Sequence, residues 1–245
     1  MKTILITGCS SGFGLETAKY FLARDWNVVA TMRDPKQSQL EASDRLRILP
    51  LDVNDPGSID AAVEAAGPID ALVNNAGIGL LGVFETENMA VVREIFETNT
   101  LGTMAVTRAV LPQFRERQAG VIVNVTSSVT LAPLPLLSVY TASKSAVTAF
   151  TQSLALELEQ FNIRMALVEP GRSPTRFGET ARKRMQQSVP EAYAGFVESV
   201  FANMGTPAGT DPVDVAEAVW RAVTDPVSPA RIPAGADAIA MAQAS

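Results

Sequence analysis

The chain has 245 residues, 47% of them hydrophobic, a formal net charge of −6, one cysteine and no histidine. This acidic balance argues against nucleic acid or an anionic membrane as a partner, and one cysteine permits no internal disulfide. Without histidine, a Ser-His-Asp triad, a Cys-His pair and a histidine-ligated zinc are excluded. Acid–base chemistry must therefore fall to tyrosine, lysine or a carboxylate, and no metal site is predicted.

No membrane or secretory segment is expected. The region 118–143 is uncharged, but its polar residues and its prolines, Pro133 and Pro135, suit a buried strand and loop better than a membrane helix. The apolar run after Lys2 ends at Gly8, which is too early for a signal peptide. The sequence thus predicts a cytoplasmic protein of one domain, residues 1–245.

Short apolar runs alternate with helical patterns along the whole chain. Several runs are continuously apolar, which is typical of strands buried on both faces of a parallel sheet. The predicted fold is therefore α/β, a doubly wound Rossmann-type sheet with helices on both faces. Strands are predicted near Thr3–Ile6, Asn27–Thr31, Leu46–Leu51, Ala71–Val73, Val121–Val125, Arg164–Val168 and around Ile232.

A glycine cluster follows the first predicted strand, and a helical pattern begins directly after it. Glycine lets the backbone turn sharply and approach a ligand, while free N–H groups at a helix start favour phosphate oxygens. The alternative is an ordinary glycine-rich turn. Cys9 in this loop is expected to be only a small side chain that fits the tight turn, because no basic residue nearby suggests an activated thiolate. The residues predicted to bind the phosphates of a dinucleotide are Gly8, Ser10, Ser11, Gly12, Phe13 and Gly14.

The end of the second predicted strand bears on the choice of cofactor. About twenty residues beyond such a glycine loop, an acid usually binds the ribose hydroxyl of NAD, or an arginine binds the 2′-phosphate of NADP. Both Arg33 and Asp34 lie there. A planar guanidinium suits a phosphate, and Ser11 could add a hydrogen bond. The alternative for Arg33 is a solvated charge paired with Asp34.

Tyr140 and Lys144 lie four residues apart in a helical pattern, so their side chains should share one face. A phenol has a pKa near 10 and is a poor acid or base at neutral pH unless a neighbouring cation favours the phenolate. Lys144 could be this cation, which would lower the pKa of Tyr140. The alternative is a chance pair on a surface helix.

These segments together resemble the short-chain dehydrogenase/reductase family over nearly the whole chain. Thr7–Gly14 is similar to its cofactor loop, Asn74–Gly77 to its fourth-strand motif and Tyr140-x-x-x-Lys144 to its active-site signature. Ser127 stands thirteen residues before the tyrosine, where the family has a catalytic serine. The hydroxysteroid and retinol dehydrogenase branch is suggested by the loop, by Ala-Thr-Met-Arg-Asp at 30–34 and by Arg-Ile-Pro-Ala-Gly-Ala-Asp at 231–237.

The resemblance implies a role for each site residue. Tyr140 would exchange a proton with the substrate oxygen, Ser127 would hydrogen-bond the same oxygen, and Lys144 would also bind the nicotinamide ribose. Asn99 would help to hold a water that leads to the lysine. Ser127 could instead cap a strand end, Asn99 a helix, and Asp52 form a turn. Asn74 is expected to support the cofactor region structurally more than chemically. The further residues that the resemblance places at the cofactor, besides Tyr140 and Lys144, are Asp52, Val53, Asn74, Ala76, Gly77, Pro170, Gly171 and Thr175.

The resemblance also implies the strand order 3-2-1-4-5-6-7, a substrate lid at about 172–208, and a homodimer or homotetramer formed through the long helices after Asn99 and Tyr140. It favours NADP over NAD, because Thr31 and Met32 occupy the strand end where NAD-preferring members have aspartate. Ser173-Pro174 departs from the family pattern before Thr175, where an aliphatic residue is usual.

The expected activity is hydride transfer between a nicotinamide and a carbonyl or secondary alcohol substrate. The substrate is expected to be apolar, although the apolar residues at 177–204 could equally serve helix burial. Two other functions stay open: a regulatory protein that binds NADP without catalysis, and a dehydratase or epimerase that keeps NAD tightly bound. Fold alone does not separate them.

Overall fold

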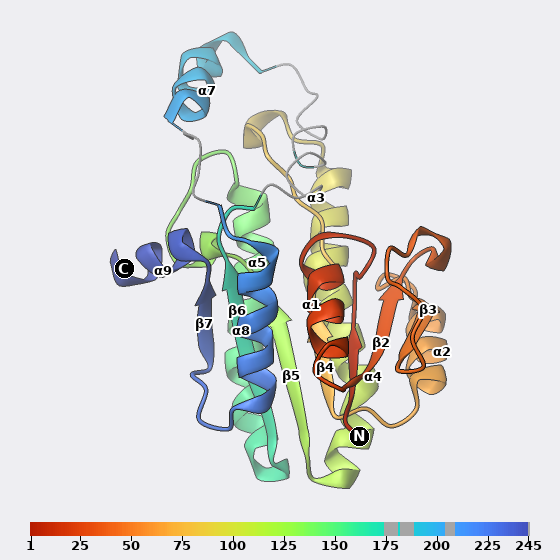
Figure 1. Cartoon of the computed structure of the whole chain (residues 1–245). Helices are drawn as coiled ribbons and strands as arrows, with labels where there is room; N and C mark the ends of the chain where they lie inside the picture. Colours follow the sequence, from red (N-terminus) through yellow and green to blue (C-terminus); the bar gives the residue numbers. More distant parts are fainter. Residues whose placement is uncertain (174–180, 182–188, 204–208, 245) are drawn as a thin grey trace.

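The computed structural model describes residues 1–173, 181, 189–203 and 209–244 (Figure 1). Seven parallel strands form one sheet in the order β3-β2-β1-β4-β5-β6-β7, which confirms the predicted fold and strand order. Each predicted strand is present and differs from the observed one by no more than two residues at either end. The strands are β1 (Thr3–Ile6), β2 (Asn27–Met32), β3 (Leu46–Pro50), β4 (Ala71–Asn74), β5 (Gly120–Val125), β6 (Ile163–Pro170) and β7 (Arg231–Ala234).

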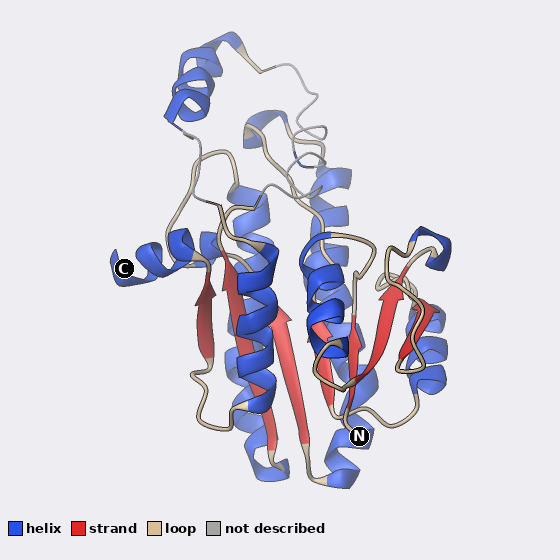
Figure 2. Cartoon of the chain, viewed as in Figure 1, coloured by secondary structure: helices blue, strands red, loops and turns tan. Residues whose placement is uncertain are grey.

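Helices cover both faces of the sheet, because successive strand residues point to opposite sides. In β1, Ile4 and Ile6 pack toward one layer of helices and Leu5 packs toward the other. The first layer contains α1 (Gly12–Leu22) and α8 (Pro212–Thr224), which lie side by side in Figures 1 and 2. The second layer contains α2 (Pro56–Ala66), α4 (Gly102–Arg117) and α5 (Ser138–Leu158).

The α-helices α3 (Met89–Phe96), α7 (Glu191–Asn203) and α9 (Ala236–Ala244) begin near the carboxyl edge of the sheet (Figure 1). A π-helical turn, η3 (Glu97–Leu101), joins α3 directly to α4. The helix α7 stands above this edge, and α9 follows β7 (Figure 1). All parallel strands end at the same edge, so the loops that follow them meet there, and such loops form the usual ligand site of a doubly wound sheet.

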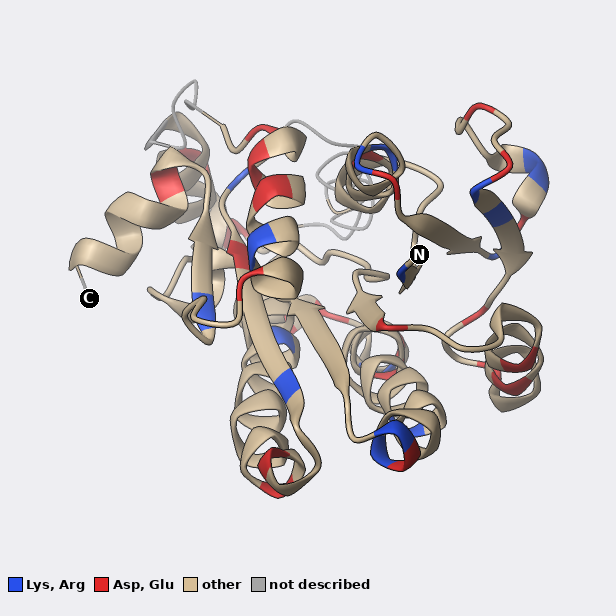
Figure 3. Cartoon of the chain, turned by 60° about the horizontal axis from the view of Figure 1, so that its bottom comes forward, with Lys and Arg blue, Asp and Glu red and all other residues tan. Residues whose placement is uncertain are grey.

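Charges are distributed over the helices and loops, with basic and acidic residues interspersed in the view of Figure 3. Among the described helices, none combines the length and the apolar composition that crossing a bilayer requires. Within the same residues, no three His, Cys, Asp or Glu side chains lie close enough together to hold a metal ion.

Candidate active site

The glycine loop connects β1 to α1 by a turn that other residues could not form. Gly8 and Gly12 have φ angles of +75° and +59°, in the left-handed region that favours glycine. A β-carbon at Gly14 would lie 2.5 Å from the carbonyl oxygen of Gly8, so the first turn of α1 packs directly on the loop. The glycines at these positions are therefore required by the backbone geometry itself.

Asn75 holds this loop in place, and the sequence analysis did not identify it. Its side-chain nitrogen donates to the carbonyl oxygens of Thr7 (2.9 Å) and Gly8 (3.1 Å). The Thr7 hydroxyl accepts from the backbone nitrogens of Asn75 and Ala76, both at 3.0 Å. The carboxyl end of β4 therefore fixes the glycine loop. In the sequence, this role of Asn75 was indicated only by its position directly after the strand, beside Asn74.

The start of α1 is suited to phosphate oxygens. Ser11 is the N-cap residue, but its side chain makes no capping hydrogen bond, and the first turn contains no acidic residue. The backbone N–H groups of this turn have no partner within the helix, and the helix dipole favours an anion there. Together with the close packing at Gly8 and Gly14, this arrangement fits the diphosphate of a dinucleotide.

Cys9 is buried in the loop and is not a reactive thiol. Its sulfur donates to the carbonyl oxygen of Ile6 at 3.3 Å, and burial raises the pKa of the thiol to about 12. A thiol with so high a pKa is not a nucleophile at neutral pH. The residue therefore packs as a small side chain, as the sequence analysis favoured.

The end of β2 presents Arg33 to solvent, and this side chain forms no ion pair with any described residue. The alternative of a pair with Asp34 is not observed, since the Asp34 carboxylate instead accepts from the Lys36 nitrogen (3.0 Å) and caps a short helix. The guanidinium therefore remains available to a ligand. A hydrogen bond from the Gln39 side chain to the Ser10 carbonyl (3.1 Å) ties the next loop to the glycine loop.

Asp52 and Val53 follow β3. Asp52 accepts a hydrogen bond from the backbone nitrogen of Asn54 at 3.0 Å, so it does form the turn that was considered as an alternative. Val53 is buried against Gly102, where a β-carbon would lie 2.8 Å from a methyl group of the valine. The first turn of α4 is therefore seated directly on this loop.

Asn74 is turned into the protein and braces the sheet. It is buried at the end of β4, and its side-chain nitrogen donates to Thr107 and to Asn124, both at 2.9 Å. Asn74 therefore supports this region structurally, as expected, and Asn75 is the residue of this motif whose side chain donates to the glycine loop.

Tyr140 lies in the first turn of α5 and is only 7% exposed. Burial raises the pKa of its phenol, and a hydrogen bond with the Ser127 side chain opposes this rise. The predicted lowering of this pKa by Lys144 is therefore wrong for the structure described here, because removal of the phenol from water outweighs the other effects. The hydrogen bond between Tyr140 and Ser127 brings together the two residues that the family resemblance implies at one substrate oxygen.

Ser127 also caps the short helix η4 (Ser128–Thr130), since its hydroxyl accepts from the backbone nitrogen of Val129 at 3.4 Å. The capping role and the contact with Tyr140 are therefore compatible. Its neighbour Ser128 is buried. The extended conformation of Ser127 at the end of β5 leaves its side chain at the carboxyl edge of the sheet, where the site forms.

Lys144 is 5% exposed and donates from Nζ to the carbonyl oxygen of Val125 at 3.0 Å. Burial lowers the pKa of this amine to about 8. Both members of the Tyr140–Lys144 pair are therefore shifted toward their neutral forms. The surface-pair alternative is excluded, because neither side chain is on the surface.

Asn99 lies within the π-helical turn and is fully buried, so it does not cap a helix. Its side chain accepts from the Ile78 nitrogen (2.8 Å) and donates to the Ile78 carbonyl (2.9 Å) and to the Ser143 hydroxyl (3.1 Å). Ser143 in turn donates to the Tyr140 carbonyl at 2.8 Å. The asparagine thus links the loop after β4 to the helix that carries the tyrosine.

At Gly77, the loop after β4 comes close to the side chains of Asn99 and Lys144. A β-carbon there would lie 3.1 Å from the Asn99 side-chain oxygen and 3.4 Å from Lys144 Nζ. Glycine at 77 therefore lets the loop approach the Asn99 side chain more closely than most residues with a β-carbon do. The four predicted catalytic residues, Asn99, Ser127, Tyr140 and Lys144, are brought together by elements far apart in the sequence.

A buried ion pair supports the Ser127 loop. Glu169 in β6 is fully buried, and its carboxylate accepts from Arg231 Nη2 (2.5 Å) and Nε (3.1 Å) in β7. The Thr130 hydroxyl lies 2.8 Å from the Glu169 carboxylate and 2.8 Å from the Ser127 carbonyl. The pair therefore fixes η4, which begins directly after Ser127.

The end of β6 supplies Pro170 and Gly171, which pair with β7 at the same edge of the sheet. Thr175, the last of the predicted cofactor residues, lies outside the described residues, as does much of the predicted lid at 172–208. Within α7, Tyr193 hydrogen-bonds to the Glu85 side chain, and this contact raises the pKa of the phenol.

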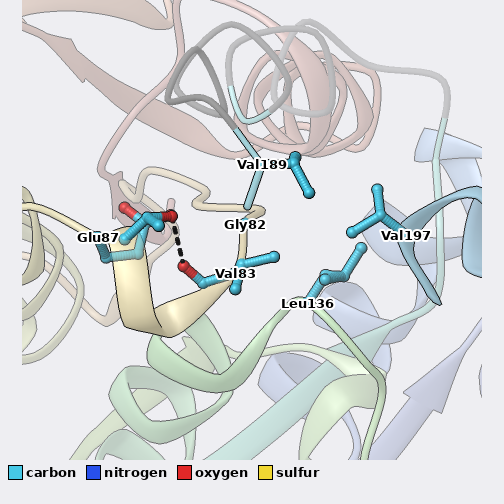
Figure 4. Close-up of a pocket in the computed structure, with 7 residues that line it drawn as sticks. Gly82, Val83, Glu87, Leu136, Val189 and Val197 are labelled. Carbon is cyan, nitrogen blue, oxygen red and sulfur yellow. Dashed lines mark hydrogen bonds between the residues drawn. The ribbon is translucent and has the colours of Figure 1, made fainter. Parts of the chain in front are cut away.

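A small apolar hollow lies beneath α7 (Figure 4). The side chains of Val83, Leu136, Val189 and Val197 point toward one another around it. Its cavity volume is about 10 Å³, roughly enough for one water molecule. Of the apolar residues at 177–204 considered for a pocket, Phe196 is 51% exposed, while Phe177, Met185 and Met204 lie outside the described residues.

The fold and the site define an oxidoreductase of the dinucleotide-binding class, and comparison with known proteins gives the family. The family described as short chain dehydrogenase matches residues 2–186. The chain belongs to this family, whose members carry out NAD(P)-dependent oxidation and reduction.

Curated relatives support the predicted branch. The chain is 38% identical to the uncharacterized oxidoreductase YusZ of Bacillus subtilis, over 91% of this chain and 85% of the relative. It is 37% identical to bovine (Bos taurus) retinol dehydrogenase 8, over 94% of this chain and 80% of the relative. These similarities are consistent with the retinol and hydroxysteroid dehydrogenase branch.

Solved structures share the architecture. A short-chain dehydrogenase from Streptomyces avermitilis is 31% identical with a TM-score of 0.85, covering 99% of this chain and 91% of that one. A 3-ketoacyl-(acyl-carrier-protein) reductase from Brucella melitensis, 31% identical with a TM-score of 0.79, is complexed with NADH (95% and 96% covered). A serine dehydrogenase, 32% identical with a TM-score of 0.81, is complexed with NADP⁺ (94% and 93% covered).

Proposed function

We propose that the protein interconverts a carbonyl compound and a secondary alcohol with NADP(H), using Tyr140 as general acid and base. The observation that carries this proposal is the buried Tyr140 phenol, hydrogen-bonded to Ser127 one helical turn from the buried amine of Lys144. A surface helix gives no reason to bury a phenol and an amine together. Proton transfer to a substrate at the carboxyl edge of the sheet gives one.

The residues have distinct tasks in this proposal. Because burial keeps the Tyr140 phenol protonated at neutral pH, the phenol can donate its proton to a carbonyl oxygen. Ser127 donates a second hydrogen bond to that oxygen, and loss of one such donor typically costs about 2.7–4 kcal/mol in the transition state. Lys144, with a pKa of about 8, is mostly protonated at pH 7 and would bind the nicotinamide ribose. When bound, the nicotinamide supplies or accepts the hydride.

The preference for NADP rests on Arg33. Its guanidinium is exposed at the end of β2 and has no ion pair among the described residues, so a 2′-phosphate would meet no competing carboxylate partner. The Ser11 hydroxyl lies in the glycine loop, makes no capping hydrogen bond and could donate one to the 2′-phosphate. The arginine at this strand end, with Ser11 nearby in the loop, therefore favours NADP over NAD.

An apolar substrate is favoured by the surroundings of the site. Leu136 lies just before α5, and its carbonyl accepts from the nitrogen of Gly82 at 2.9 Å, which joins the two segments that line the apolar hollow. Similarity to retinol dehydrogenase 8 points the same way, since that name describes a largely apolar alcohol. We further propose that the protein forms a homodimer or homotetramer, which light scattering after size-exclusion chromatography would measure.

The test is turnover by a Tyr140→Phe variant. NADPH and NADH binding is first titrated by nucleotide fluorescence, and apolar aldehydes and ketones are then added to the same sample. We expect the parent to oxidise NADPH, and Tyr140→Phe to bind NADPH normally while its turnover falls at least 100-fold, as for loss of a general acid. Turnover at the parent rate would refute the assignment.

The two rival functions give different results in the same experiment. A regulatory protein would bind NADPH but oxidise none of it with any carbonyl. An epimerase or dehydratase would copurify with nucleotide and show no net change in NADPH absorbance. Tighter binding of NADH than of NADPH would contradict only the cofactor preference.

A further inference from the structure

Asp237 joins the two ends of a long excursion of the chain. The segment leaves the sheet after β6 at Arg172 and returns at Thr210, just before α8. One oxygen of the Asp237 carboxylate accepts from the Arg172 backbone nitrogen, and the other accepts from the Thr210 hydroxyl, both at 2.7 Å. The Thr210 nitrogen also donates to the Arg172 carbonyl at 2.7 Å. Both ends are therefore fixed to each other and to the start of α9.

Two glycines leave the space that this junction needs. A β-carbon at Gly171 would lie only 2.0–2.3 Å from the three atoms of the Asp237 carboxyl group. Gly235 has a φ angle of +93°, and a β-carbon there would lie 2.2 Å from the Thr210 hydroxyl oxygen. A larger residue at Gly171 would displace the carboxylate itself, and one at Gly235 would displace its partner Thr210. The two glycines thus leave space on both sides of the hydrogen bond between Thr210 and Asp237.

The junction is continuous with the candidate cofactor site. Gly171 donates from its nitrogen to the Ala234 carbonyl at 3.1 Å, and Pro170 is paired with Ala234 in the sheet. The Thr210 hydroxyl lies 3.1 Å from the same carbonyl oxygen. The Pro170–Gly171 turn is therefore held on one side by β7 and on the other by the carboxylate of Asp237.

We propose that Asp237, acting through Thr210 and Arg172, positions the Pro170–Gly171 turn for binding of the nicotinamide cofactor. The effect of Asp237 on cofactor binding rests on the proposed function, whereas its hydrogen bonds to Arg172 and Thr210 do not. Among the described residues, the side-chain hydrogen bonds of Asp237 and Thr210 go to each other, to Arg172 and to Ala234, so we assign them as positioning residues. The motif at 231–237 thereby gains a role at both ends: Arg231 supports the Ser127 loop and Asp237 supports the loop after β6.

Two pairs of variants separate this role from simple destabilisation. Asp237→Ala removes both acceptors, whereas Asp237→Asn can keep both links, because its amide oxygen accepts from Arg172 and its amide nitrogen donates to the Thr210 oxygen. The Thr210 hydrogen would then turn to the Ala234 carbonyl. Thr210→Val removes the hydroxyl with little change of shape, and Thr210→Ser retains it. Asn and Ser are thus the matched controls for Ala and Val.

The first measurement uses the protein without nucleotide. Hydrogen exchange of the backbone amides at 172 and 210 should be about tenfold faster in Asp237→Ala, as expected for loss of a hydrogen bond to an ionised carboxylate. Thr210→Val should accelerate the amide at 210, and the two control variants should stay within about twofold of the parent. Exchange at the parent rate in both Asp237→Ala and Thr210→Val would overturn the proposal. If Asp237→Ala does not fold, Thr210→Val and Thr210→Ser carry the test.

The second measurement concerns the cofactor. Asp237→Ala and Thr210→Val should bind NADPH roughly tenfold more weakly, with turnover reduced up to about 100-fold by misplacement of the turn, while Asp237→Asn and Thr210→Ser restore both. Faster exchange with parent-like NADPH binding and turnover would reduce the junction to a structural role and overturn the positioning role. A parent protein that neither binds NADPH nor reduces carbonyls would instead sink the proposed function, and the exchange measurement would still decide whether Asp237 holds the junction.

Discussion

The two ends of the candidate cofactor site are built in opposite ways. At the reaction centre, Asn99, Tyr140 and Lys144 are 0%, 7% and 5% exposed, and each is tied to other elements by hydrogen bonds. At the end of β2, Arg33 is exposed and has no ion pair in the part of the chain that the structure describes. The residues that position the reacting groups are therefore distinct from the residue proposed to select NADP over NAD. Changes at the centre should alter stability and chemistry together, whereas changes at Arg33 should alter affinity alone.

The largest effect on stability is expected from the ion pair behind the Ser127 loop. Glu169 is fully buried, whereas the Arg231 side chain is 39% exposed. Arg231→Met would leave the buried carboxylate without its cation, and we expect this to cost about 3–5 kcal/mol of unfolding free energy. Glu169→Gln would leave only a partly solvated cation, so its cost should be smaller, about 1–2 kcal/mol. Urea unfolding of both variants measures the asymmetry.

The matched control for these variants is Thr130→Val, which removes only the hydroxyl that joins the carboxylate to the Ser127 carbonyl. Its stability should lie close to that of the parent, within the range of one lost hydrogen bond, about 1 kcal/mol. Equal losses in Arg231→Met and Glu169→Gln would mean that burial of Glu169 is not what makes the pair sensitive.

The next effect follows from Lys144 and depends on pH. Burial lowers the pKa of this amine from 10.5 to about 8 in the folded protein. Between these values the unfolded chain holds a proton that the folded protein has released, so the free energy of unfolding rises with pH across this window. Below about pH 8 both states are protonated and the folded state carries the full penalty.

Lys144→Met provides the reference for this measurement, since it removes the titrating amine and leaves the other groups in place. The stability of the parent relative to Lys144→Met should rise by about 3 kcal/mol between pH 7 and pH 10.5. Urea unfolding without nucleotide at a series of pH values would detect the rise. A constant difference would show that Lys144 keeps its proton throughout and that the buried centre is better solvated than its geometry indicates.

The smallest effect is expected at the exposed end. Arg33→Ala should weaken NADPH binding about tenfold, as expected for loss of a charged hydrogen bond, and leave NADH binding unchanged. Its melting temperature should match that of the parent, because the side chain forms no ion pair with the described residues. Lys36→Ala, an exposed cation three residues further on, serves as the control. Equal loss of NADPH and NADH affinity would contradict the 2′-phosphate assignment.

Sequence reasoning located the strands because buried parallel strands are short, apolar and separated by helical patterns. Thr3–Ile6 was predicted with its observed limits, and the other strands differ only at their ends, where pairing with a neighbour decides the last residues. The glycine loop was also accessible, since its residues are required by backbone geometry close in sequence. Residues that act over long sequence distances were harder to find, and Asn75 is the clearest example.

The main error of the sequence-based prediction concerned the pKa of Tyr140, because the effect of burial was not foreseen. The spacing of Tyr140 and Lys144 gave their shared helix face, but not the desolvation that raises one pKa and lowers the other. The structural role of Asn74 was expected, but its position beside Asn75 gives no sign that the Asn75 side chain faces the glycine loop while that of Asn74 faces the sheet interior.

The amino-acid order by itself determined the alternation of strands and helices, the glycine turn before α1 and the shared helix face of Tyr140 and Lys144, because these depend on local conformation and short spacing. Ser127 was identified only through the family resemblance. Only the tertiary structure decided which polar groups are buried away from solvent and which asparagine supports the glycine loop. It also decided that Asp237 joins Arg172 and Thr210, which are 38 positions apart in the sequence. Those features depend on contacts between distant segments, and such contacts exist only once the sheet has assembled.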